Sequence, residues 1–233
     1  MRWKSTFSSF LMILIVVAAL PAIHLLKTRI SEAGVPEITG RPLSSTTLWF
    51  QLSLVLLSLI VFGIALLLKG GGRERHHFFR VGMIAAPVKP ACAIRIAFLL
   101  IITAVTALLM FFQVVEGEAQ VYMSGRVILF ALLFSVTNSF GEEMIFRTSL
   151  VSVLDGRLPG SSVSLISGVI FGIAHYWGHP GGVPGVLLAG FLGWFLARSM
   201  METRGFFWAW LIHFCQDVVI FTSLFLVTES ALL

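Results

Sequence analysis

The chain consists mainly of long apolar runs separated by shorter polar segments. A helix needs about 20 consecutive apolar residues to cross the hydrocarbon core of a bilayer. Seven runs of about this length cover residues 7–26, 47–68, 91–112, 127–154, 162–177, 184–200 and 206–227. The pattern predicts an all-α fold, a polytopic transmembrane helix bundle of about seven spans.

Ionisable residues are distributed unevenly between the two halves of the chain. The first three runs carry almost none apart from His24 and Arg95, whereas the later runs contain Glu, His, Asp and Arg. We therefore divide the chain into residues 1–112, three N-terminal transmembrane helices with a basic cytoplasmic loop, and residues 113–233, a membrane core that we expect to hold the chemistry.

Composition supports a membrane protein and excludes several other classes. Hydrophobic residues make up 58% of the chain and charged residues 12%, against about 25% charged residues in a typical soluble domain. The net charge of +5 is small, and basic loops beside membrane spans usually meet anionic headgroups. A soluble enzyme is excluded on these grounds, and we expect the lipid bilayer, and no nucleic acid, as a partner.

The basic residues predict the orientation in the membrane, because Lys and Arg accumulate in cytoplasmic loops. With a cytoplasmic N-terminus, 11 of the 16 basic residues fall on the inner side, namely Arg2, Lys4, Lys69, Arg73, Arg75, Arg80, Lys89, Arg95, Arg157, Arg198 and Arg204. We expect this orientation in a bacterial inner membrane. The loop between Lys69 and Arg95, with His76 and His77, is expected to lie along the cytoplasmic headgroups.

The fourth run carries two adjacent carboxylates and an arginine. Glu143 and Arg147 are one helical turn apart and can form an ion pair. Glu142 points about 100° away from Glu143, so it is free to face a cavity and serve as a general base. The alternative is a buried ion network that only holds helices together.

The fifth and seventh runs add imidazoles and a further carboxylate. His175 follows Phe171 by four positions, and Gly168 and Gly172 allow another helix to approach closely. His213 and Asp217 lie one turn apart on one face of the seventh run. Taken singly, each histidine could equally be a buried side chain whose hydrogen bonds are satisfied and which has no role in chemistry. Taken together, these polar groups are the parts of a hydrolytic site that activates water.

Three short motifs stand out in chain order: Glu142-Glu143 with Arg147 after three residues, Phe171 with His175 after three residues, and His213 with Asp217 after three residues. In order and spacing they resemble the EExxxR, FxxxH and HxxxN or HxxxD motifs of the CAAX-protease and bacteriocin-processing (CPBP, or Abi) membrane proteases. The resemblance covers residues 127–225. It implies an all-helical bundle with a cavity and a catalytic core within residues 113–233.

The resemblance also implies roles for individual residues. Glu142 and His175 would activate a water, and His213 and Asp217 would bind it or stabilise the oxyanion, with Glu143, Arg147 and Phe171 in structural support. The substrate would be a membrane-anchored protein or peptide. Members of the family cut prenylated CAAX proteins, mature bacteriocins or remove C-terminal sorting anchors.

One position departs from part of the family: Asp217 stands where the eukaryotic prenyl-protein enzymes carry Asn. An ionised Asp cannot donate a hydrogen bond to an oxyanion, so we expect Asp217 to orient His213. A mechanism without a metal cofactor is preferred. The alternative is a zinc site, since imidazoles and carboxylates are common zinc ligands, and its ligands would be Glu142, His175, His213 and Asp217.

Two further functions compete with the protease. In an ion-coupled transporter, the buried Glu, His and Asp would relay charge across the membrane. In a catalytically inactive immunity or scaffold protein, the family's fold would remain without its activity. The concentration of ionisable residues in one half of the chain favours a single site over a transport path, and the intact set of motif residues favours an enzyme.

Overall fold

The computed structural model describes residues 2–33, 42–69, 89–116, 124–178 and 181–230, which are almost entirely helical. In chain order the elements are α1 (Arg2–Glu32), α2 (Pro42–Lys69), α3 (Lys89–Glu116), α4 (Gly125–Glu143), the π-helical segment η2 (Met144–Ser149), α5 (Leu150–Leu154), α6 (Gly160–Ala174), the 3₁₀ turn η3 (His175–Trp177), α7 (Gly182–Thr203) and α8 (Phe207–Ser230). These ranges contain no β-strand, only an isolated bridge between Asp155 and Leu158. The predicted all-α class is confirmed.

Six segments within these ranges are long and apolar enough to cross a membrane. They are Thr6–Glu32, Ser45–Lys69, Ile94–Phe112, Gly125–Leu154, Gly182–Thr203 and Phe207–Leu226. The fifth predicted run, 162–177, is absent from these six segments and corresponds to α6 and η3. Because α6 has 15 residues, it is about 22 Å long, less than the roughly 30 Å of a hydrocarbon core. α6 is therefore too short to cross the hydrocarbon core by itself, and His175 directly follows its last residue.

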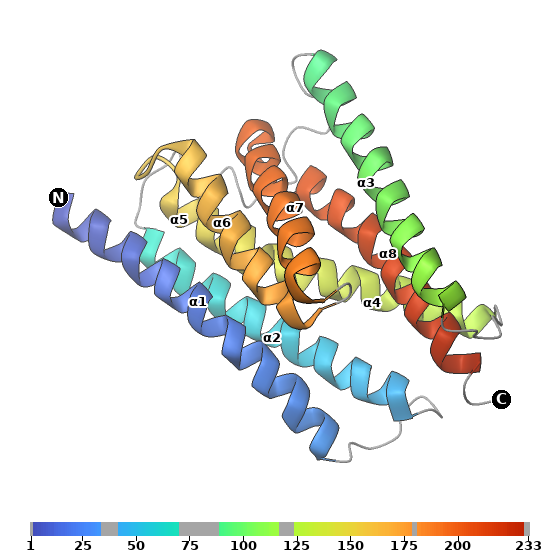
Figure 1. Ribbon diagram of the computed structural model, residues 1–233. Helices are drawn as coiled ribbons and strands as arrows, with labels where there is room; N and C mark the ends of the chain where they lie inside the picture. The colour runs from blue at the N-terminus through green and yellow to red at the C-terminus, as the bar shows by residue number, and fades with distance from the viewer. Residues whose placement is uncertain (1, 34–41, 70–88, 117–123, 179–180, 231–233) are drawn as a thin grey trace.

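The helices form one bundle in which the N-terminal helices pack directly on the later ones (Figure 1). α1 and α2 lie side by side on one flank, α3 and α8 on the other, and α6 and α7 between them. α4 packs against α2 on one side and α8 on the other. The two predicted parts of the chain, divided near residue 112, thus share extensive contacts.

Two glycines of α6 allow α7 to approach closely. A Cβ atom added at Gly168 would lie 2.7 Å from the carbonyl oxygen of Gly190, and one at Gly172 would lie 2.6 Å from that of Val186. Both distances are too short for a real side chain, so only glycine permits this spacing. The expectation that these glycines admit a neighbouring helix is confirmed, and the contact fixes the end of α6 that carries His175.

α3 is attached to α7 near one end of the bundle. Arg95 donates to Ser199 at 2.9 Å and to Glu202 at 2.8 Å, and the ring of Phe98 stacks on Phe195 with centroids 3.5 Å apart. The segment expected along the cytoplasmic headgroups, with His76 and His77, lies outside the described residues.

Candidate active site

The chain changes helical geometry where the first motif lies. The fourth predicted run, 127–154, passes continuously from α4 through the π-helical segment η2 into α5. All residues of η2 are buried, and Ser149 Oγ donates to the carbonyl oxygen of Met144, five positions earlier, at 2.6 Å. A π-helical segment rotates the residues after it relative to a regular helix and is frequent at functional sites. Here it begins directly after Glu142 and Glu143.

Glu143 connects two parts of the site. Its Oε1 lies 3.2 Å from Nη1 of Arg147 and 2.8 Å from Nδ1 of His213. The side chains of Glu143 and Arg147 are completely buried, and that of His213 is 3% exposed. The expected Glu143–Arg147 pair is therefore present, and the same carboxylate also binds an imidazole of α8.

The ring of Phe171 packs against Arg147 and both histidines. The guanidinium of Arg147 lies 3.7 Å from the centre of the Phe171 ring, within range of a cation–π interaction. The same ring contacts both imidazoles, with centroids 4.2 Å from His175 and 5.5 Å from His213. The aromatic residue of the second motif thus packs Arg147 and both histidines into fixed positions.

His175 stands in the 3₁₀ turn that follows α6. Its Nδ1 lies 2.9 Å from the carbonyl oxygen of Phe171. Since a carbonyl oxygen only accepts, Nδ1 must carry the proton in this contact. The other ring nitrogen, Nε2, lies 3.9 Å from Oε2 of Glu142.

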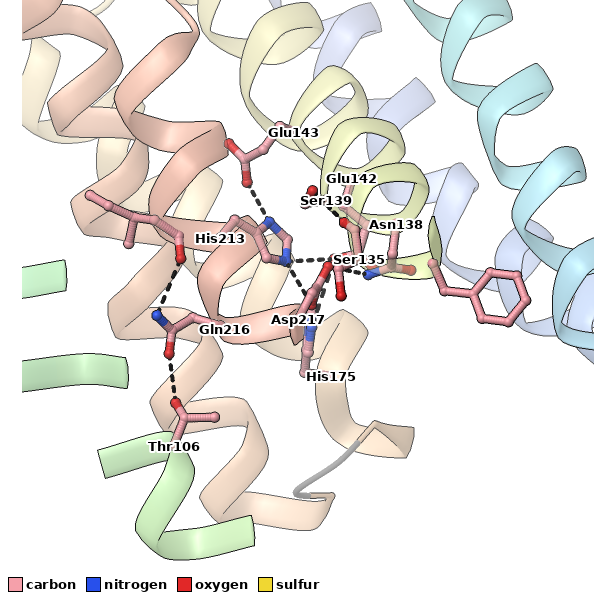
Figure 2. A network of polar contacts seen from close by, with 12 residues as sticks. Thr106, Ser135, Asn138, Ser139, Glu142, Glu143, His175, His213, Gln216 and Asp217 are labelled. Atoms are coloured by element: carbon pink, nitrogen blue, oxygen red, sulfur yellow. Dashed lines mark hydrogen bonds and ion pairs between the residues drawn. The ribbon is translucent and has the colours of Figure 1, made fainter. Parts of the chain in front are cut away.

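His213 is oriented in a corresponding way. Its Nδ1 faces the carboxylate of Glu143 and donates to it. Its Nε2 lies 3.6 Å from Oε2 of Glu142 and 3.6 Å from Oδ1 of Asp217. Both imidazoles therefore turn Nε2 toward one carboxylate oxygen of Glu142, as Figure 2 shows. That oxygen is buried and has no hydrogen-bond partner within the described part of the chain.

Asp217 has an amide partner that the sequence reading missed. Asn138 Nδ2 donates to Asp217 Oδ2 at 3.1 Å (Figure 2), and Asn138 Oδ1 accepts from Nε2 of Gln51 at 3.2 Å. Nδ1 of His213 donates to Glu143, and Asp217 faces Nε2 of the same ring at 3.6 Å. The imidazole is therefore held between two carboxylates, of which the sequence predicted only Asp217. Amide side chains inside apolar runs were the available signal for Asn138 and Gln51.

A groove leads to the site between α3, α7 and α8. Its lining is mostly apolar, and the polar lining residues are Thr106, His175, His213, Gln216 and Asp217. Gln216 links α8 to α3 beside the groove, because its amide nitrogen donates to Thr103 at 2.8 Å and its Oε1 accepts from Thr106 at 2.8 Å.

Glu142 lies behind the two imidazoles and does not line the groove. Its side chain is 17% exposed, so it is less buried than Glu143. Within the described residues, no three or more His, Cys, Asp and Glu side chains form a group that could hold a metal ion. The arrangement brings all seven predicted motif residues together and is suited to a water held between Glu142 and the imidazoles.

Comparison with known families agrees with the motifs. Residues 124–219 match the family model described as type II CAAX prenyl endopeptidase, Rce1-like. The matched segment runs from the start of α4 to just past Asp217 and includes all three motifs. No curated protein and no solved structure matches the chain. The family match confirms the resemblance to the CAAX proteases.

Proposed function

Because residues 124–219 match the family model of the type II CAAX prenyl endopeptidases, Rce1-like, we propose that this chain is an endopeptidase that cuts a membrane-associated protein or peptide within the bilayer. Water, activated by Glu142 and His175, attacks the peptide bond. The observation that carries this proposal is the convergence of Nε2 of His175 and Nε2 of His213 on one oxygen of Glu142, at 3.9 and 3.6 Å.

The distances suit general-base catalysis. Catalytic contacts are often loose in the absence of substrate and tighten in the complex, so a water can lie within hydrogen-bond reach of both Glu142 and His175. The carboxylate of Glu142 takes a proton as the water oxygen attacks the carbonyl carbon. The same proton then passes to the leaving nitrogen as the carbon–nitrogen bond breaks.

The other motif residues support this reaction. His213, when Nε2 carries a proton, can donate to the oxyanion that develops on the former carbonyl. Asp217 lies beside the same nitrogen at 3.6 Å. Glu143 fixes the opposite side of the ring through its 2.8 Å contact with Nδ1. The metal-free mechanism is the preferred one. Zinc held by Glu142, His175, His213 and Asp217 is the alternative, although these side chains, all of which the structure describes, do not form a metal-binding group.

The groove suggests how the substrate reaches this site. It is lined by apolar residues such as Val105, Leu188 and Leu192 together with His175 and Asp217. An apolar segment held there brings its peptide bond to the water without leaving the bilayer. Substrates of the CAAX, bacteriocin-precursor or C-terminal sorting type all satisfy this requirement.

Membranes of cells that express the wild-type chain provide the test. Mass spectrometry of new protein termini should reveal products that are absent when Glu142 is replaced by Gln, since the amide keeps the shape but is a far weaker base. Glu32→Gln is the matched control, because Glu32 is an exposed carboxylate on α1, and it should leave the products unchanged. Cleavage that survives in a folded Glu142→Gln variant would overturn the mechanism.

Two rival functions are distinguished when this experiment is combined with a measurement of ion flux through liposomes that contain the protein. A wild-type chain that produces no new termini and moves no ion corresponds to an inactive immunity or scaffold protein. Proton or ion flux through liposomes, lost in Glu142→Gln, corresponds to an ion-coupled transporter.

The proposed setting is a bacterial inner membrane with the N-terminus in the cytoplasm, as the basic residues indicate. Reporter enzymes that are active on one side of the membrane, fused before Arg2 or after residue 233, test the orientation directly. The inner side is expected for the first fusion.

A further inference from the structure

We propose that Gln51 and Asn138 are positioning residues that hold the carboxylate of Asp217 in its working orientation, a role that rests on the proposed function. Both lie outside the three motifs. Gln51 comes from α2, in the part of the chain that shows no family match. The catalytic site would then depend on an N-terminal helix.

The first step is the contact between Asn138 and Asp217. Asn138 Nδ2 donates to Oδ2 of Asp217 at 3.1 Å, while the other oxygen, Oδ1, lies 3.6 Å from Nε2 of His213. A hydrogen bond on one carboxylate oxygen limits rotation of the whole group. Asn138 thus keeps Oδ1 turned toward the imidazole.

The second step fixes the amide of Asn138 itself. Its nitrogen must face the carboxylate, so its Oδ1 points away and accepts from Gln51 Nε2 at 3.2 Å. The Oε1 of Gln51 in turn lies 3.2 Å from the hydroxyl of Thr137, which can donate to it. If the Asn138 amide were rotated by half a turn, its Oδ1 would face Oδ2 of Asp217 and its Nδ2 would face Nε2 of Gln51. The hydrogen bond from Gln51 to Oδ1 therefore stabilises the observed orientation.

Two of the residues that make these contacts are buried, so loss of their hydrogen bonds should be costly. Gln51 is 1% exposed and Asp217 is 4% exposed, and buried polar groups are costly when they lose a partner. Asn138 also precedes Glu142 by four positions on α4, so it lies on the same helical face as the proposed base. Gln51, Asn138 and Asp217 therefore connect α2, α4 and α8 at the site.

Neither amide lines the groove. Loss of either should disturb the reacting groups while leaving the substrate's binding surface intact. This predicts an effect on kcat with little change in KM, because a small misplacement of a catalytic group can reduce the rate by up to about 100-fold.

The experiment compares Asn138→Leu and Gln51→Met, which keep side-chain size but remove the hydrogen bonds, in the purified full-length protein. Each should lower kcat by about 10-fold to 100-fold with KM within about threefold. Ser58→Ala is the control: Ser58 is also a buried polar residue of α2, and its hydroxyl bonds to Val55 O in its own helix. It should keep the wild-type kcat.

The double variant tests whether the two amides act in series. If Gln51 works through Asn138, adding Gln51→Met to Asn138→Leu should cause little further loss of kcat. The inference would be overturned if the two single-variant losses of kcat multiply in the double variant. It would also be overturned if the loss of activity only follows the loss of folded protein, as judged by thermal unfolding. Wild-type kcat in Asn138→Leu, with Glu142→Gln inactive, would reject the positioning role alone. A wild-type protein without cleavage would reject the proposed function as well.

Discussion

Glu143 and His213 are 70 positions apart in the chain, yet Oε1 of the glutamate lies 2.8 Å from Nδ1 of the imidazole. The same oxygen pairs with Arg147 at 3.2 Å. Glu143 therefore joins a structural ion pair to a residue of the proposed reaction. A substitution of Arg147 should therefore change the position of His213 through Glu143. The guanidinium of Arg147 itself packs on the ring of Phe171.

Replacement of Arg147 by Ala should reduce the amount of folded protein as well as its activity. It leaves the fully buried Glu143 without its cationic partner of η2, and breaking a buried pair costs about 3 to 5 kcal/mol. The measurement is the unfolding temperature in detergent together with the protein level in membranes. Arg198→Ala, which removes an exposed i,i+4 pair with Glu202, should change stability by less than about 1 kcal/mol. Equal losses in the two variants would contradict the structural role of Arg147.

Replacement of Gly172 by Ala should push α6 away from α7 and displace His175. The added Cβ would lie 2.6 Å from the backbone oxygen of Val186 and 3.0 Å from Gly190 Cα, and such overpacking costs about 1 to 3 kcal/mol. A lower unfolding temperature and a lower kcat are expected. Gly63→Ala on α2 is the matched control, since a Cβ there has nothing within 4 Å. If both variants unfold like the wild type, the close packing of α6 and α7 is not required for stability.

Replacement of Ala189 by Phe should obstruct the groove. Ala189 lines it and is 9% exposed, so a large ring there occupies the space that we assign to the substrate. KM should rise by about tenfold or more, which corresponds to about 1.4 kcal/mol of lost binding. Leu187→Phe adds a ring to the same helix at an exposed position that does not line the groove, and its KM should stay near the wild-type value. An unchanged KM in Ala189→Phe would mean that the substrate enters elsewhere.

A strong chelator should leave the activity of the purified protein unchanged under the metal-free mechanism, because Glu142 itself is the base. A zinc enzyme would lose activity with the chelator, regain it with added zinc and contain nearly one metal per chain in elemental analysis. Reversible inhibition of this kind would replace the proposed mechanism with a metalloprotease that uses the same residues.

The sequence alone was sufficient for features that depend on one helix at a time. Long apolar runs require helices in a bilayer because the backbone must satisfy its own hydrogen bonds there. The one-turn spacing predicts that Glu143 and Arg147 can pair, and that His213 and Asp217 share a face. The three motifs together were specific enough to indicate a resemblance to the CAAX proteases, and the family model that matches residues 124–219 agrees with it.

Features that depend on two or more helices came from the tertiary structure. The contact of Glu143 with His213 exists because α4 packs on α8, and periodicity within one helix says nothing about distances to another. The place of His175 depends on a short α6 held against α7 by glycine contacts. The π-helical turns, the groove and the amides of Gln51 and Asn138 also arise from packing. The sequence thus determined which polar groups enter the membrane, whereas the packing of the helices decided which of them meet, since their partners lie on separate helices and come together only when the bundle closes.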